Sequence, residues 1–178
     1  MIATPNGPRM RETVIILLLN QTLLNISEME RQLNQVRVRV TGPHAAALRA
    51  LVEGFVSELH DCAHLIDERL SARKKLVQLY DCGKQESGLP GYPRGPMDCQ
   101  EHLENLLSRY ALFARSVYHA LGVAKELGFH EEVELFGQLV CVMNRSIWFL
   151  EIHWEANAVG MDSSHLPDWT PNLHAGYS

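Results

Sequence analysis

The sequence predicts an all-α protein: a four-helix bundle in which a long crossover, itself containing a short helix, joins two helical pairs. Long segments carry apolar residues at steps of three and four. Sharp Gly and Pro breaks separate these segments, and one connector is much longer than the others. Two long helices, a long crossover and two more helices is a known bundle layout. We expect the bundle to occupy residues 1–160 and a C-terminal tail without periodicity to occupy residues 161–178.

The first two helices are expected at about residues 11–39 and 43–70. The residues at 36–40 alternate between Val and Arg and in isolation predict a strand. We assign them to the first helix only because of a family resemblance described below. Gly42 suits the left-handed position after a helix, and Pro43 suits the first turn of the next one.

The connector at residues 72–98 ends in a Gly- and Pro-rich stretch that cannot be helical, although its start could form one or two helical turns. Asp98 and Glu101 make a plausible capping box for the third helix, which should stop at Gly128. The fourth helix is expected from near residue 131 until just before residue 160.

Composition excludes several classes of protein. The formal net charge is −5 without a block of like charge, so the basic footprint of a DNA-binding protein is absent. The apolar run at residues 14–19 is too short to span a membrane and lacks a cleavage site behind it. The four cysteines form no CxxC pair and are interpreted as reduced thiols of a cytoplasmic protein: Cys62, Cys82, Cys99 and Cys141.

Several short motifs follow one another along the chain at a characteristic spacing. They are Leu19-Asn20, Gly42-Pro43, Ala47-Leu48, Glu53-Gly54-Phe55, Glu68-Arg69, Tyr92-Pro93, His102-Leu103, Arg109-Tyr110-Ala111 and Trp148-Phe149-Leu150-Glu151. Together they resemble the Dps family, the starvation-induced mini-ferritins, over about residues 12–155. The resemblance implies a ferritin-like bundle with a small crossover helix, here around Ala72–Asp81. It also implies a hollow dodecamer that oxidises ferrous iron and stores the ferric mineral.

The family's oxidation site lies between two subunits, and the resemblance implies that its ligand positions are Arg37, Arg49, Glu53, His64 and Glu68. Only Glu53 and Glu68 keep carboxylates there. His64 changes the ligand type, while the two arginines replace imidazoles with cations that keep their protons. The usual iron chemistry is therefore altered at this site.

Two interpretations of the second helix stay open. In one, the subunit interface holds no metal and arginine–carboxylate pairs replace the missing ion. In the other, an altered metal site uses Glu53, His60, His64 and Glu68, because imidazole and carboxylate together suit iron or zinc. Whether the chain is an enzyme depends on this choice: it is a ferroxidase, with peroxide or oxygen as oxidant, if the altered site still binds metal.

We therefore expect a Dps-like mini-ferritin, a dodecameric homo-oligomer that takes ferrous iron and binds neither DNA nor membranes. The alternative is a structural or stress-protection cage without ferroxidase activity. Three acidic residues at the start of the fourth helix either line a pore of the shell or complement the helix dipole: Glu131, Glu132 and Glu134.

Overall fold

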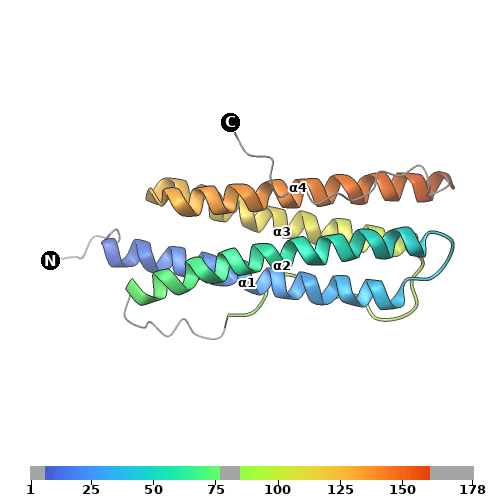
Figure 1. The fold of residues 1–178 in the computed structure, drawn as a ribbon, viewed down its shortest axis with the longest axis horizontal. Coiled ribbons are helices and arrows are strands. Elements are labelled where there is room, and N and C mark those ends of the chain that lie inside the picture. Colours follow the sequence, from blue (N-terminus) through green and yellow to red (C-terminus); the bar gives the residue numbers. More distant parts are fainter. Residues whose placement is uncertain (1–6, 77–84, 161–178) are drawn as a thin grey trace.

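Four long helices make up the bundle in the computed structural model, which describes residues 7–76 and 85–160 (Figure 1). They are α1 (Pro8–Arg39), α2 (Ala45–Leu76), α3 (Cys99–Leu127) and α4 (His130–Val159). The closest packing joins α1 to α2 and α3 to α4. Figure 1 shows α2 and α3 starting at the same end of the bundle, as a long crossover requires. The predicted all-α, ferritin-like four-helix bundle is confirmed.

The core runs through the centre of all four helices. Phe55 of α2 meets Tyr110 of α3 edge to face, with ring centroids 5.4 Å apart. Phe113 and Phe136 are also fully buried. Within the described residues, α4 is long and apolar enough, by length and composition alone, to cross a membrane. Because residues such as Phe136 and Met143 lie in the bundle core, we interpret it as a core helix.

The start of α1 differs slightly from the expectation, whereas its end at Arg39 agrees with it. The helix begins at Pro8, which occupies its first turn, where a missing N–H costs nothing. At the other end, residues 36–39 are helical, although their alternating Val and Arg residues in isolation predict a strand. Val36 and Val40 are both fully buried, so the alternation places two valines against the core at helical spacing of four.

The second helix is shifted relative to the prediction. It begins at Ala45, because Gly42 (φ 102°) and the two residues after it form the turn. It continues to Leu76, six residues beyond the predicted end. Residues 72–76, expected to open a separate crossover helix, are therefore the end of α2, and residues 77–81 of that predicted helix lie outside the described residues.

The ends of α3 and the end of α4 confirm the local signals. Asp98 and Glu101 form the complete capping box at the start of α3, with side-chain to backbone distances of 2.8 and 2.9 Å. Gly128 (φ 76°) and Gly160 (φ 68°) both adopt the left-handed conformation after α3 and α4. The domain boundary at residue 160 stays a prediction, because residues 161–178 lie outside the described part of the chain.

The crossover is fastened to α1 by side-chain amides. Asn25 Oδ1 accepts hydrogen bonds from the Gly88 backbone N–H (2.9 Å) and from the Ser87 hydroxyl (3.1 Å). Gln32, which is fully buried, donates to the carbonyl of Pro90 at 2.9 Å. These bonds satisfy backbone groups of residues 85–98, the described part of the crossover, which forms no helix.

The crossover is fastened to α3 through Tyr92. Its hydroxyl lies 2.8 Å from Nδ1 of the fully buried His102. The Arg109 guanidinium lies over the Tyr92 ring and donates to the Gly91 carbonyl at 3.0 Å. Burial lowers the pKa of His102, and the nearby Arg39 lowers it further. Three of the family-like motifs thus meet at one structural contact.

Candidate functional site

The polar face of α2 carries all the residues predicted to bind metal. Glu53, His60, His64 and Glu68 are exposed in the subunit, whereas residues such as Phe55 on the opposite face are buried. A helix rises about 1.5 Å per residue, so Glu53 and Glu68 lie about 22 Å apart along α2. Within one subunit they cannot bind the same ion.

Only the two histidines of this set come together. His60 Nε2 and His64 Nε2 are 3.1 Å apart, with the rings nearly perpendicular. Glu30 of α1 approaches the other side of His60, with Oε1 3.7 Å from Nδ1. Burial raises the pKa of Glu30, an effect that both histidines partly oppose. Sequence reasoning missed Glu30, because nothing in its own helix marks it as facing these rings.

No group of three or more His, Cys, Asp and Glu side chains within residues 7–76 and 85–160 is arranged to hold a metal ion. The four-residue metal set therefore stays a prediction. If it forms, the additional ligands come from a second copy of the chain, as the resemblance implied.

The two arginines that the resemblance places at ligand positions are exposed, and Arg49 bonds to the backbone of its own chain. The charge-paired interface between two copies stays a prediction. Arg49 donates from Nη2 to the Val40 carbonyl at 2.6 Å and from Nε to the Arg37 carbonyl at 3.2 Å. It thereby satisfies carbonyls that the end of α1 leaves free. Among the described residues, neither Arg37 nor Arg49 forms an ion pair with Glu53.

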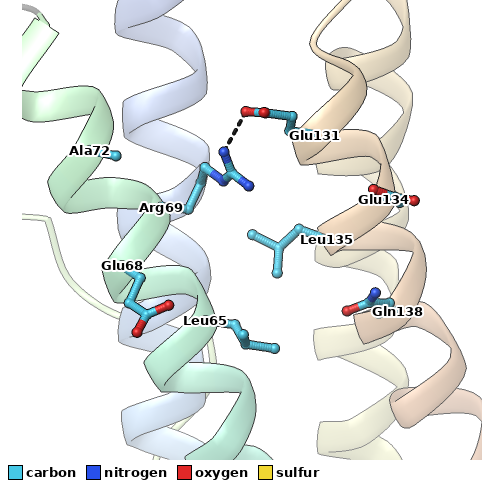
Figure 2. A pocket seen from close by; sticks show the side chains of 8 residues that line it. All are labelled: Leu65, Glu68, Arg69, Ala72, Glu131, Glu134, Leu135 and Gln138. Carbon is cyan, nitrogen blue, oxygen red and sulfur yellow. Dashed lines mark hydrogen bonds and ion pairs between the residues drawn. The ribbon is translucent and has the colours of Figure 1, made fainter. Parts of the chain in front are cut away.

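A cleft of about 360 Å³ opens between the second half of α2 and the start of α4. Figure 2 shows Arg69 reaching across it to Glu131, with which it forms an ion pair. Glu68 and Glu134 project from opposite sides, and Leu135 lies between them (Figure 2). The cleft is therefore an ion-paired, partly apolar seam, and its carboxylates do not converge on one point.

The acidic residues at the start of α4 differ in burial and in their contacts. Glu132 is fully buried and receives two hydrogen bonds from Arg73 of α2, at 2.7 and 2.8 Å. Arg73 also contacts Glu12 of α1 at 3.1 Å. Arg73 thus ties three helices together, and Glu132 does not face solvent. Glu134 is exposed, so a pore role stays a prediction for it.

The described cysteines show no sign of activated thiols. Cys62, Cys99 and Cys141 are free. Burial raises the pKa of Cys62 to about 12, and burial also raises the pKa of Cys99. Because the thiolate is the nucleophile and the metal ligand, these two side chains are inert. Cys82 lies outside the described residues.

Comparison with known sequences gives one Dps-family relative. The chain is 24% identical, over 151 residues, to a "DNA protection during starvation protein" of Agrobacterium fabrum, covering 82% of this chain and 91% of the relative. No family model matches the chain. The expected resemblance to the Dps family is confirmed in sequence across most of both chains.

Solved structures show the same fold. Dps of Mycobacterium smegmatis superposes with a TM-score of 0.72 at 16% identity, covering 86% of this chain and 93% of that protein. A Dps protein of Vibrio cholerae, described as a member of a broad superfamily of ferritin-like diiron-carboxylate proteins, gives 0.70 at 13% identity, covering 85% and 98%. At these identities the likeness establishes the fold.

Proposed function

We propose that this chain, which lies beside the Dps family in both sequence and fold, is the subunit of an iron-storing cage with an altered metal site. The site would use Glu53, His60, His64 and Glu68, contributed by two copies of α2. The observation that carries the proposal is the contact of Arg49 with the backbone at the end of α1. Since Arg49 is engaged there, the Glu53 carboxylate stays available to a cation.

Iron is the cargo that fits this proposal best. The Vibrio cholerae protein of the same fold is described as a diiron-carboxylate superfamily member. Carboxylates with imidazoles are adequate ligands for ferrous iron. Arg37 and Arg49 stand where the resemblance implies two imidazole ligands. Because this site lacks those two ligands, we expect slow oxidation of ferrous iron.

Iron oxidation by the purified protein, in air and with peroxide, tests the metal site. We compare the wild type with Glu53→Gln/Glu68→Gln and with the control Glu126→Gln, which removes an exposed carboxylate from α3. The double variant should lose the acceleration over buffer, and the control should keep it. Equal rates for all three proteins and for buffer would instead favour a structural cage without ferroxidase activity.

The alternative cage is favoured by the two arginines at the usual ligand positions. A gain-of-function variant also distinguishes the altered metal site from the cage without ferroxidase activity. Arg37→His/Arg49→His adds two imidazoles beside existing carboxylates and should raise the affinity for ferrous iron. Unchanged affinity in this variant would show that the α2 interface does not bring these positions together, and both versions of the site would fail.

Assembly as a closed dodecamer is the second part of the proposal. Two large side chains on the outer face of α3 and α4 are half exposed: Tyr118 (49%) and Trp148 (52%). Exposed aromatic surface of this kind is typical of subunit contacts. Native mass spectrometry should show a dodecamer of the 20.1 kDa chain, and a population of only monomers and dimers at micromolar concentration would exclude the cage.

We also propose a cytoplasmic cage that does not bind DNA tightly. The net charge of −5 opposes phosphate binding, and the few cations near the N-terminus cannot sustain binding that weakens steeply with salt. A gel shift that persists at physiological ionic strength would contradict this.

A further inference from the structure

One small cluster shares His60 and His64 with the proposed interface site, but a single subunit supplies all of its residues. His60 and His64 lie one turn apart on α2, and their Nε2 atoms are 3.1 Å apart. Glu30 approaches Nδ1 of His60 from α1 at 3.7 Å. Both rings are exposed, the His60 side chain to 64%.

We propose that His60 and His64 chelate one divalent transition-metal ion within a single subunit, and that Glu30 positions His60 for this role. An imidazole nitrogen binds such an ion at about 2.0–2.1 Å. Two ligands at that distance, with an angle of about 90–109° between them, lie about 2.8–3.4 Å apart. The observed 3.1 Å between the Nε2 atoms falls within this range.

Glu30 supplies the second argument. Its Oε1 atom is buried and has no hydrogen-bond partner among the described residues. It faces Nδ1 of His60, the nitrogen that points away from His64. A carboxylate at that position keeps the proton on Nδ1, which leaves the lone pair of Nε2 free for the ion. The carboxylate then orients the ligand without binding the metal itself.

The chemistry of the pair selects the class of ion. Two neutral imidazoles and open positions for water suit Cu²⁺ and Zn²⁺ better than Mn²⁺ or Fe²⁺, following the general order of affinities for divalent metals. The chelate needs neither a partner subunit nor Glu53 and Glu68. Although it shares His60 and His64 with the proposed iron site, the chelate can therefore form even if the interface site does not.

Titration of the assembled protein with Cu²⁺ and with Zn²⁺, by calorimetry, tests the proposal. His60→Ala and His64→Ala should each weaken Cu²⁺ binding at least about tenfold, since each removes one of two ligands. The matched control His119→Ala, an exposed histidine on α3, should bind as the wild type does. The electron paramagnetic resonance spectrum of bound Cu²⁺ should report two nitrogen ligands in the wild type and one in either α2 variant.

The same experiment separates this chelate from the interface site. Glu53→Gln/Glu68→Gln should bind Cu²⁺ as tightly as the wild type, whatever its effect on iron. If this double variant loses Cu²⁺ to the same extent as His60→Ala, the site is the four-residue interface site and the chelate is excluded. Unchanged binding in His60→Ala would also exclude it.

Glu30 has its own test. Glu30→Gln should weaken Cu²⁺ binding about 10–100-fold, the usual effect of removing a carboxylate behind a ligating histidine. Nitrogen NMR of the metal-free protein should show His60 protonated at Nδ1 in the wild type and a mixture of tautomers in the variant. An unchanged tautomer together with unchanged affinity would overturn the positioning role of Glu30.

Discussion

Removing one partner of the ion pair between Arg73 and Glu132 should cost more stability than removing one partner of any exposed pair among the described residues. The Glu132 side chain is 0% exposed and that of Arg73 is 15% exposed, and two hydrogen bonds join them. Arg73→Met would leave the buried carboxylate without its hydrogen-bonded partner, with only Arg69 Nε at 4.0 Å. Breaking a buried pair in this way costs about 3–5 kcal/mol. Each kcal/mol lowers Tm by about 2–4 °C in a chain of this size, so we expect a decrease of about 6–20 °C.

Urea denaturation is the assay, at one fixed protein concentration because the proposed assembly would add a concentration-dependent contribution. Arg31→Ala is the control: Arg31 pairs with Glu28 but is 52% exposed, so its loss should cost about 0–1 kcal/mol. The double variant Arg73→Met/Glu132→Leu removes the charge as well and should recover most of the loss. If Arg73→Met costs no more than the control, the pair does not hold α2 and α4 together and the reasoning is refuted.

Three further predictions concern the rest of the bundle. Tyr92→Phe should lower the free energy of unfolding by about 1–3 kcal/mol, because it leaves Nδ1 of the buried His102 without a hydrogen-bond partner. Thermal unfolding measures this loss, and a loss below about 0.5 kcal/mol would show that water replaces the hydroxyl. Burial lowers the pKa of both His102 and His153 from 6.5, so the unfolded chain takes up protons first on acidification. Stability should be complete above about pH 6.5 and fall as the pH drops through the lowered values; flat urea midpoints between pH 7 and pH 5 would contradict this. Gly128→Ala should destabilise the protein by about 1 kcal/mol, because Gly128 has a φ of +76°. Gly137→Ala, inside α4, should instead stabilise it by about 0.5–1 kcal/mol. Equal unfolding midpoints for the two variants would show that backbone conformation does not decide the effect.

The helix ends that the sequence predicts well are those determined by neighbouring residues. The capping box of Asp98 and Glu101 and the left-handed glycines at 128 and 160 each act within a few residues of the chain. Their geometry does not depend on the rest of the fold, so a local pattern is sufficient to find them.

The helix ends that a local pattern does not determine depend on distant contacts, and only the end of α2, not that of α1, is misplaced. The extension of α2 to Leu76 includes Arg73, whose partners belong to α1 and α4. At the end of α1, the family resemblance alone decided between strand and helix for residues 36–40. There the structure adds burial of two valines and the contact from Arg49, neither of which is visible in the local pattern.

In the candidate site, too, some features follow from the local sequence pattern and others depend on contacts that the pattern does not show. Helical spacing correctly placed His60, His64 and Glu68 on the exposed face of α2, since a residue and its fourth neighbour share a side. Glu30 could not be found this way, because its approach to His60 depends on how α1 and α2 are aligned against each other. The role of Arg49 was also missed, because an arginine on a helix can bond to a carboxylate or to a nearby backbone carbonyl, and the sequence does not distinguish them.

The contact of Arg49 with the end of α1 has a consequence for any variant that places a histidine at this position. The shorter side chain of histidine would give up the bonds to the carbonyls of Arg37 and Val40. The variant should therefore loosen the end of α1 in the metal-free protein. A gain in metal affinity at position 49 would thus be accompanied by a loss of stability, and bound metal would have to compensate for it.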